Sequence, residues 1–401
     1  MFHDSRWRQA LTFLTGSVHR AGYVSALGPT WVEELPPPKL RGPAWSLVAN
    51  RLCGICGSDT KQIFLEGRYD NPLTAVISFP HVLGHELMGV VAEPGPESGL
   101  SKGTRVALCA SIACAVRGTV PPCRMCAMGQ PPLCEGLTLG PFAPAIHIGN
   151  SRDLNGGFSE QVAAHRTQLY AIPDHVSDEQ AMIADTVSVA LQPLVRHPPR
   201  LDRPVLVYGM GSIGLCTVAI ARALYPSAEL WAVARYPHQA LLAKQLGANQ
   251  VFTSKPLEVI EAVIAQGGGP VRKPWYGLPW LERGAGTIYD TISSAETMEI
   301  SLRIADKRAV LVQMGVATPH QFEWTLLYFK EVELKGSNAF GVVDWEGRPQ
   351  HCYEIYWQLI RRGLDVSKIL SHRFTLAQWK QAMLCARDRR GGAVKVAMAP
   401  G

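Results

Sequence analysis

The sequence contains no run of five or more like charges, no internal repeat and no low-complexity segment. Charged residues make up only 18% of it, and 39 Lys and Arg against 33 Asp and Glu leave a formal charge of +6. Because the basic residues are scattered, the sequence predicts no nucleic-acid partner. A hydrophobic fraction of 47% over 401 residues excludes a disordered or fibrous chain. This length corresponds to roughly two or three globular domains.

Long hydrophobic runs are also missing. The longest uncharged apolar stretch, 205–221, is interrupted by glycines, whereas a bilayer span needs about 20 apolar residues. The first residues carry charges and are followed by neither the apolar core nor the cleavage site of a signal peptide. We therefore expect no membrane partner and no targeting signal. The ten cysteines are spaced like metal ligands, which favours a cytoplasmic protein without disulfide bonds.

Three stretches of the chain differ in composition. The first, to about residue 175, is rich in Pro, Gly and short β-type runs, which indicates a β-rich domain. Ser177 followed by Gln180 is a capping-box pattern that begins a helix running towards Val195. We expect a first part of one domain over 1–185, a second domain over 186–335, and residues 336–401 returning to the first domain.

The middle stretch alternates short apolar runs with helical patterns. Such alternation is typical of a doubly wound α/β domain with a parallel sheet, a Rossmann-type fold. The expected strands are 205–208, 229–233, 250–253, 286–291 and 309–315, and the clearest helices are 212–224 and 238–246. Residues 267–284 read as a surface insertion between two of these elements.

A glycine-rich turn follows the first of these strands and begins the next helix. In the pattern Gly209-x-Gly211-x-x-Gly214, the first glycine makes the tight turn and the second admits the pyrophosphate of a dinucleotide. The third glycine lets helix and strand pack closely. The phosphates would lie on the N–H groups at the helix N-terminus, which include those of Ser212 and Ile213.

The end of the next strand distinguishes between the two nicotinamide cofactors. NAD-binding folds usually carry an acidic residue about 20 residues beyond the glycine pattern. Here that position is Ala234, and Arg235 follows it. A missing carboxylate beside a guanidinium suits the 2′-phosphate of NADP, so we favour NADP(H) over NAD(H).

Two groups of residues have the composition of zinc sites. Cys53 to Asp59, His85 with Glu86, and Asp185 can supply one thiolate, one imidazole and one carboxylate, leaving a fourth position open for catalysis. Four further cysteines within 21 residues predict a closed structural site, namely Cys114, Cys123, Cys126 and Cys134. The other cysteines are expected to be ordinary core residues.

These motifs together resemble the zinc-dependent alcohol dehydrogenases of the medium-chain dehydrogenase/reductase superfamily. The resemblance extends from about residue 37 to the C-terminus. It is carried by CGICGSD (53–59), GHELMGVV (84–91), CRMCAMGQPPLC (123–134), GGFSEQV (156–162), DEQAMIADTVSVAL (178–191) and YGMGSIGL (208–215). It implies a GroES-like catalytic domain beside the Rossmann domain, and a homodimer or homotetramer.

The resemblance also implies roles for individual residues. By position, Cys56, His85 and Asp185 match the three ligands of the catalytic zinc, and Glu86 matches a glutamate that can exchange with water or substrate at the metal. Asp59 matches the carboxylate that orients the histidine ligand. Ser58 matches the hydroxyl that passes on the alcohol proton.

The chain departs from the family pattern at two places. The structural-zinc cysteines of the family are spaced C-x2-C-x2-C-x7-C, and the first of these positions is Val120 here. Cys114 could replace it if the following segment contains an insertion, and Cys109 is the alternative. Gln192 occupies a position where many relatives have histidine, which would alter the substrate pocket or the proton relay.

The resulting expectation is a zinc-dependent enzyme that transfers a hydride between NADP(H) and an alcohol or carbonyl substrate. Two alternatives stay open at this point. One is a zinc-free reductase of quinones or enones in the same superfamily, and the other is a non-catalytic nucleotide-binding module. The sequence does not name the substrate or the direction of the reaction.

Overall fold

The computed structural model describes residues 1–67, 70–317, 320–338 and 341–400. The chain forms two compact units. Unit 1 comprises Met1–Asp185 with Leu370–Gly401, and unit 2 comprises Thr186–Ile369.

The predicted domain ranges, 1–185, 186–335 and 336–401, differ from this division for residues 336–369. These residues belong to unit 2 because helix α6 (Ala184–Arg196) holds them there. The Gln192 side chain donates to the carbonyl of Asn338 at 2.6 Å, and Arg196 donates to that of Val342 at 3.1 Å.

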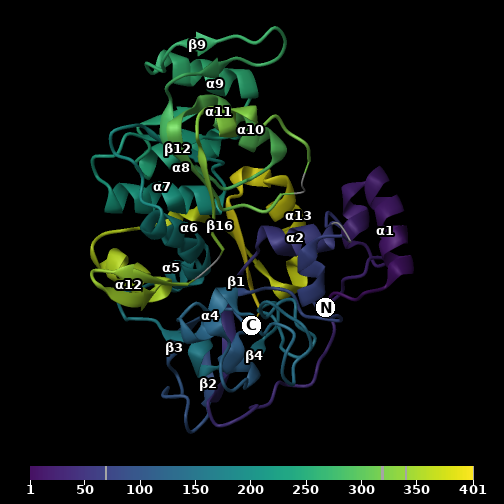
Figure 1. The fold of residues 1–401 in the computed structure, drawn as a ribbon. Coiled ribbons are helices and arrows are strands. Elements are labelled where there is room, and N and C mark those ends of the chain that lie inside the picture. Colours follow the sequence, from purple (N-terminus) through teal and green to yellow (C-terminus); the bar gives the residue numbers. More distant parts are fainter. Residues whose placement is uncertain (68–69, 318–319, 339–340, 401) are drawn as a thin grey trace. The chain divides into compact units, whose positions relative to one another are not determined.

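Unit 1 is built on a seven-stranded sheet in the order β16-β17-β1-β2-β3-β5, with β4 also paired to β1 (Figure 1). The strands are β1 (Trp45–Gly54), β2 (Glu86–Pro94), β3 (Arg105–Leu108), β4 (Gln161–His165), β5 (Leu169–Ala171), β16 (Leu370–Thr375) and β17 (Lys395–Ala399). The α-helices are α1 (Arg6–Val18), α2 (Gly57–Ile63), α3 (Cys114–Arg117), α4 (Arg124–Ala127), α5 (Asp178–Met182) and α13 (Trp379–Asp388).

The long strand β1 holds this unit together. It pairs antiparallel with β2 and β4, and β17 returns from the C-terminus to pair with its last residues, Cys53 opposite Met398. The last residues of β1 are buried, because partners on both edges and side chains on both faces exclude water from them. The sheet therefore places residues near 54, 86 and 395 side by side, although they are far apart in the sequence.

The segment before β1 is an addition to this sheet. It contains helix α1, drawn in purple in Figure 1, and then an extended stretch through residues 31–41. Phe2 forms β-bridges with Thr30 and His81, and Arg20 forms an ion pair with Asp388 of α13 at 2.6 Å. These contacts attach the N-terminal segment to the body of unit 1.

Unit 2 contains a six-stranded sheet in the order β13-β12-β11-β6-β7-β8, and every strand pair in it is parallel. Its strands are β6 (Val205–Tyr208), β7 (Leu230–Val233), β8 (Gln250–Phe252), β11 (Ala285–Asp290), β12 (Ala305–Gln313) and β13 (Glu333–Gly336). Its α-helices include α7 (Ser212–Leu224), α8 (Pro237–Gln245), α9 (Pro256–Ala265), α10 (Ala295–Ile304), α11 (Thr325–Phe329) and α12 (Cys352–Arg361).

This arrangement confirms the predicted doubly wound sheet. Four of the expected strands agree with the structure to within one residue, whereas β12 begins before the predicted 309–315 and β13 was not expected. All four residues of β6 are buried, as expected where helices cover both faces of a parallel sheet. The capping box of Ser177 and Gln180 is also present, but it opens the short helix α5, and the chain bends at Ile183 before α6 begins. The structure thus contains two helices where the sequence predicted one.

Two hairpins lie outside the large sheets. The predicted insertion contains β9 (Val271–Arg272) and β10 (Trp280–Leu281), and β14 (Val342–Trp345) pairs with β15 (Arg348–His351). Trp275 and Tyr276, between β9 and β10, are almost fully exposed. In Figure 1 this hairpin extends beyond α9.

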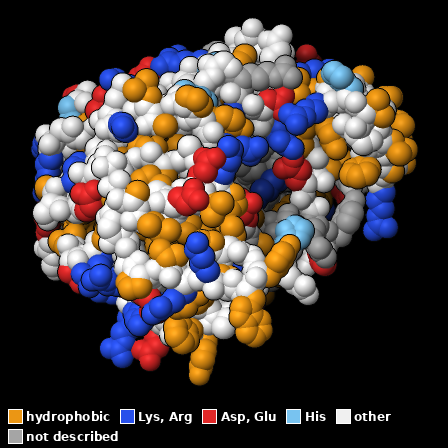
Figure 2. Space-filling model, turned by 90° about the horizontal axis from the view of Figure 1, so that it is seen from above, with side chains coloured by type: hydrophobic (Ala, Val, Ile, Leu, Met, Phe, Trp, Pro, Cys, Tyr) orange, Lys and Arg blue, Asp and Glu red, His pale blue; other side chains and the backbone are white. Residues whose placement is uncertain are grey.

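No helix among the described residues is long and apolar enough to span a bilayer. On the face drawn in Figure 2, basic, acidic and hydrophobic side chains are interspersed among the coloured residues. This face therefore carries mixed charge, in agreement with the scattered basic residues of the sequence.

Candidate zinc and cofactor sites

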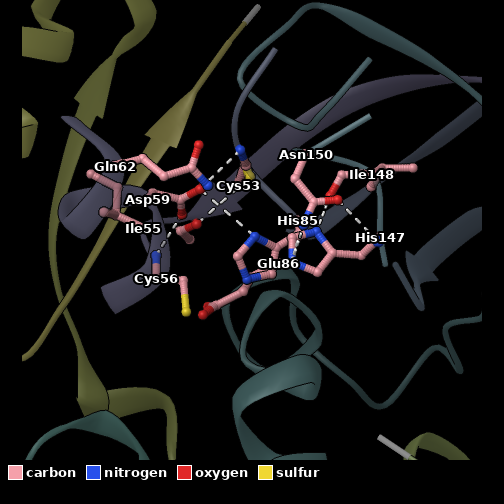
Figure 3. Close-up of polar contacts among 12 residues, drawn as sticks. Cys53, Ile55, Cys56, Asp59, Gln62, His85, Glu86, His147, Ile148 and Asn150 are labelled. Carbon is pink, nitrogen blue, oxygen red and sulfur yellow. Dashed lines mark hydrogen bonds and ion pairs between the residues drawn. The ribbon is translucent and has the colours of Figure 1, made fainter. Parts of the chain in front are cut away.

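Three side chains with metal-binding atoms meet where β1, α2 and β2 come together. Cys56 caps the N-terminus of α2, His85 directly precedes β2, and Glu86 is its first residue. The thiol sulfur, one imidazole nitrogen and one carboxylate oxygen all lie within 4.8 Å of one another. Figure 3 shows the three groups pointing towards one another. A soft thiolate, an imidazole and a carboxylate are the ligand types that zinc accepts.

Asp59 connects the two loops that carry these ligands. Its carboxylate, only 1% exposed, accepts the N–H of Cys56 at 2.9 Å and the N–H of Gly84 at 3.2 Å. One carboxylate oxygen lies 3.7 Å from Nδ1 of His85. Asp59 therefore fixes the spacing between Cys56 and His85 and faces the imidazole with negative charge, as outer carboxylates do in metal sites.

The electrostatics of His85 favour a cation. Burial acts to lower the pKa of His85, but the charges of Asp59 and Cys56 outweigh it and raise the pKa to about 10. Groups that stabilise a proton on an imidazole to this extent also stabilise a metal ion in its place. The donor set and its charge together fit zinc.

Glu86 also takes part in a buried ion pair. The ammonium of Lys395, at the start of β17, contacts the Glu86 carboxylate and donates to the carbonyl of Ile55 at 3.3 Å. Both residues are 3% exposed. Although burial acts to raise it, Lys395 lowers the pKa of Glu86, which keeps the carboxylate ionised.

Asp185 and Ser58, the other predicted members of this site, are placed differently. Asp185 lies in the first turn of α6 and is 6% exposed, but it is outside the group of atoms within 4.8 Å of one another. Burial and the charge of Glu86 raise the pKa of Asp185 to about 7. The hydroxyl of Ser58 is buried and has no hydrogen-bond partner among the residues that the structure describes.

Two functional positions were missed by the sequence analysis. One is Lys395, a single charge inside the apolar run GGAVKVAMA, which is a signal that sequence inspection can detect. The other is His147, whose ring lies 4.3 Å from the ring of His85, centroid to centroid (Figure 3). Nδ1 of His147 contacts the carbonyl of Ile148, and Nε2 lies 3.4 Å from the Asn150 amide. Nothing in the local sequence indicates this contact.

Cys53 and Gln192 have surroundings of their own. Cys53 is fully buried on β1, and its sulfur is not part of the ligand group, so it is a core neighbour of the site. Gln192 of α6 is 3% exposed and bonds through its amide nitrogen to the segment at Asn338. At this position the side chain therefore has a structural contact within unit 2.

The four cysteines of the second group also converge. The sulfurs of Cys114, Cys123, Cys126 and Cys134 lie within 4.8 Å of one another, which matches the tetrahedral arrangement of a closed zinc site. Cys114 begins α3, and Gly118 in the left-handed conformation ends that helix. The chain from there to residue 122 forms a loop, and this loop lets Cys114 join Cys123 despite the unusual spacing. Cys109 lies outside the group.

Backbone N–H groups support negative charge on these sulfurs. The N–H of Cys123 points to the Cys114 sulfur at 3.3 Å, and that of Gly136 points to the Cys134 sulfur at 3.3 Å. Burial acts to raise the pKa of Cys123, but N–H groups of Cys126 and Glu135 lower it to about 6. Burial instead raises the pKa of Cys126 and of Cys134, so these two thiols must lose their protons when zinc binds.

In unit 2 the three glycines after β6 occupy distinct environments. Gly209 has φ +92°, and a Cβ there would meet the Ile292 side chain at 2.6 Å. A Cβ on Gly214 would lie 1.8 Å from the Gly209 carbonyl oxygen, so this glycine is required for α7 to pack. At Gly211 nothing lies within 4 Å of the added atom. The open side of the loop thus faces outward at the N-terminus of α7, where phosphates bind.

Arg235 follows β7 by two residues. Strand β7 pairs with β6, the strand that leads into the glycine loop. The Arg235 side chain is exposed, and its guanidinium carbon lies 5.6 Å from the centre of the Tyr236 ring. Among the described residues, no ion pair joins Arg235 to a carboxylate. A cation is therefore available at the strand end where ribose-binding acids usually lie.

A β-rich unit with a thiolate, imidazole and carboxylate cluster, together with a doubly wound unit with a dinucleotide loop, defines a zinc-binding dehydrogenase. Comparison with protein families agrees with this class. Residues 42–174 match the alcohol dehydrogenase GroES-like domain, and residues 212–360 match the zinc-binding dehydrogenase domain. The chain belongs to the zinc-dependent alcohol dehydrogenases of the medium-chain dehydrogenase/reductase superfamily, and it is an oxidoreductase.

Individual relatives are distant but similar over nearly their whole length. The chain is 26% identical over 363 residues to the L-idonate 5-dehydrogenase of Vitis vinifera, covering 88% of each chain. It is 25% identical to the L-threonine 3-dehydrogenase of a Chelativorans strain, covering 91% of this chain and 94% of that protein. A zinc-binding dehydrogenase from Sinorhizobium meliloti, solved with NADP bound, has the same fold: the TM-score is 0.71 at 24% identity, with 92% and 95% of the chains covered.

Proposed function

We propose that this protein is a zinc-dependent dehydrogenase that moves a hydride between NADP(H) and a secondary alcohol or the matching ketone. The observation that carries the proposal is the convergence of Cys56, His85 and Glu86. Ser58 lies two residues after Cys56 in the first turn of α2, and its buried hydroxyl has no partner among the described residues. A group of metal-binding side chains, with a nearby residue in the chain whose hydroxyl can relay a proton, suits alcohol oxidation.

The catalytic zinc would be held by Cys56, His85 and Asp185, with Glu86 able to replace water or substrate. Zinc, when bound, supplies Lewis acidity at the substrate oxygen. The protein's own residues do the rest: Asp59 holds the His85 ring, and the Ser58 hydroxyl relays the alcohol proton, taking it up as its own proton passes on towards the cofactor ribose and solvent, and in the reverse order during reduction. Lys395 keeps the Glu86 carboxylate ionised and turned towards its own ammonium. A second, structural zinc would be held by Cys114, Cys123, Cys126 and Cys134.

The cofactor assignment rests on the loop and on Arg235. The positions of Gly209, Gly211 and Gly214 suit a dinucleotide pyrophosphate at the start of α7, where the N–H groups of Ser212 and Ile213 lie. The exposed guanidinium of Arg235 suits the 2′-phosphate of NADP.

The substrate class follows from the names of the curated relatives. The 5-hydroxyl of idonate and the 3-hydroxyl of threonine are both secondary and lie next to other polar groups. We infer a small, polar secondary alcohol as the substrate of this chain.

Association of two or four copies is proposed through unit 2. Strand β13 is an end strand of the sheet, and one of its edges pairs with β12. Several apolar side chains on and before it are exposed, namely Trp324, Tyr328, Phe329 and Leu334. An open strand edge with exposed apolar residues suits pairing with a second copy. The ten free thiols favour the reducing cytoplasm as the location.

An initial-rate panel tests these proposals. NADP+ and NAD+ would be compared with polar secondary alcohols, polyols, primary alcohols and aromatic alcohols, and the ketones would be tested in reverse, with and without a zinc chelator. We expect turnover of secondary alcohols with NADP+ that is lost with chelator. Chelator-resistant reduction of quinones or enones would instead identify a zinc-free reductase. Zinc-loaded protein without activity in any arm would support the non-catalytic nucleotide-binding alternative.

A further inference from the structure

A groove of about 570 Å³ lies within unit 1, between the N-terminal segment and the body of the unit. None of Cys56, His85 and Glu86 lines it, so the groove is separate from this group of metal-binding side chains. One wall is the extended segment 30–38, which ends in three prolines and precedes the residues that match the family. Its volume falls in the range of about 300–1,000 Å³ that is typical of small-molecule sites.

The floor of the groove is part of the hydrophobic core. Ile63, Leu83, Trp379, Met383 and Met398 line it, and all five belong to one cluster of buried residues. Their exposed fractions are between 1% and 8%. The proline triplet keeps the segment above this floor extended. The floor is therefore an apolar surface against which a ring or a hydrocarbon chain can pack.

The charged side chains that line the groove are acidic: Glu33, Glu34 and Glu160. The N-terminal amine of Met1 also lines it and donates to the carbonyl of Trp31, and burial lowers the pKa of this amine to about 6. Glu33 lies 3.2 Å from the imidazole of His3, whereas no ion pair joins Glu34 or Glu160 to a basic side chain in the described part of the chain. Thr30 also lines the groove and is 7% exposed, and its hydroxyl has no hydrogen-bond partner among the described residues. An ammonium group is a donor that suits both an unpaired hydroxyl oxygen and carboxylates.

We propose that this groove is a binding site for a small molecule with an apolar body and a positively charged amine. The apolar body lies on the floor formed by Met383, Met398 and their neighbours, and the ammonium lies at the acidic edge with Thr30. The site does not depend on the proposed reaction, because none of the residues that hold zinc or cofactor takes part in it.

The test uses the full-length, zinc-loaded protein and 4-phenylbutylamine as the probe, followed by isothermal titration calorimetry. N-acetyl-4-phenylbutylamine and 5-phenylpentanoate have the same apolar body without the positive charge. We expect the amine to bind at least about tenfold more tightly than the neutral amide, with the carboxylate weaker still. Equal affinity for the three probes, or binding by none of them, would overturn the proposal.

Variants locate the binding. The double change Glu34→Gln and Glu160→Gln should weaken amine binding about tenfold and leave the amide unchanged, since it removes charge and little volume. Glu97→Gln is the matched control, because Glu97 is an exposed acid of the same unit outside the groove. Met383→Trp should fill the floor and abolish binding of both probes. If Met383→Trp does not fold, the glutamine variants decide alone: amine affinity that survives them lies elsewhere, for instance at the zinc, and the proposal fails.

Discussion

Lys395 and Glu86 form an ion pair in which each residue is only 3% exposed. The pair joins the first residue of β17 to the first residue of β2, so the C-terminal strand determines where a metal-site carboxylate points. It lies so close to β1 that a Cβ on Gly54 would meet the Glu86 carboxylate at 2.7 Å and the Lys395 side chain at 2.9 Å. The geometry leaves no room for a larger residue at that position.

Replacing Lys395 by Met should destabilise the protein. The change would leave the Glu86 carboxylate buried without its cation, and breaking a buried pair in this way costs about 3 kcal/mol or more. The free energy of unfolding checks the loss, measured in urea on protein stripped of metal at the catalytic site, so that no zinc charge compensates Glu86. Adding Glu86→Gln in the same chain should recover part of it, because the lone charge is then removed. An unfolding free energy of Lys395→Met equal to that of the original protein would mean that water already reaches the carboxylate.

An added methyl group should have different effects at the two glycines at the start of α7. At Gly214 it should lower stability, and at Gly211 it should weaken binding of NADP+. Gly214→Ala places a Cβ 1.8 Å from the Gly209 carbonyl oxygen, so the helix must shift, and overpacking of this kind costs about 1–3 kcal/mol. Gly211→Ala meets nothing within 4 Å, so the melting temperature should stay the same while the dissociation constant of NADP+ rises. If Gly211→Ala binds NADP+ unchanged, the pyrophosphate does not approach the loop at this residue.

Arg235→Ala should change the cofactor preference. A charge-assisted contact to a 2′-phosphate contributes about 1.5–3 kcal/mol, so kcat/KM for NADP+ should fall about 10- to 100-fold. The value for NAD+ should be unaffected, because NAD+ lacks that phosphate. Arg272→Ala, at the exposed hairpin of the same unit, is the control. An equal loss with both cofactors would place Arg235 at a group that they share.

Much of the fold could be predicted because its signals are local. The strand at 205–208, the helix at 212–224 and the glycines between them follow from periodicity and turn chemistry over a few residues. The break between α5 and α6 at Ile183 could not be predicted, since no proline or glycine marks it. The C-terminal limit of unit 2 could not be predicted from the sequence either. It depends on hydrogen bonds from the side chains of Gln192 and Arg196 to the backbone carbonyls of Asn338 and Val342.

The candidate site also has residues that could be predicted from the sequence and residues that could not. Cys56, Asp59 and His85 lie in short motifs, so their chemistry is readable from the sequence. Lys395 can be noticed in the sequence as a lone charge in an apolar run, but its partner cannot. Its place beside Glu86 depends on sheet pairing, and that of His147 beside His85 depends on loop packing, and a sequence carries no direct record of such contacts. The choice of Cys114 over Cys109 likewise depends on the loop after Gly118, whose path the spacing alone does not determine.

Cys114→Ser should remove the structural zinc and leave the catalytic one. The four sulfurs share one centre, and three thiolates with a hydroxyl hold zinc far less tightly than four thiolates do. Zinc content measured by atomic emission should fall by one ion per chain, with a lower melting temperature. Cys109→Ser should keep the full zinc content, because Cys109 lies outside the group. Loss of zinc from Cys109→Ser but not from Cys114→Ser would reverse the assignment.

The affinity of the catalytic site for metal should rise with pH. In metal-free protein the pKa of His85 is raised to about 10, so its imidazole carries a proton at neutral pH, and a metal must displace that proton to bind. Each bound metal thus releases about one proton from His85, and the apparent dissociation constant should fall about tenfold per pH unit between about pH 8 and about pH 9. Below about pH 7 the fall should be steeper, because Asp185, another proposed ligand with a pKa raised to about 7, is then protonated as well. Cobalt titrated into protein stripped at this site alone gives an optical readout through its bond to Cys56. Asp59→Asn removes a charge that raises the pKa of His85, so the dependence should flatten towards the upper end of this range. An affinity independent of pH in the original protein would show that His85 is neutral before the metal arrives.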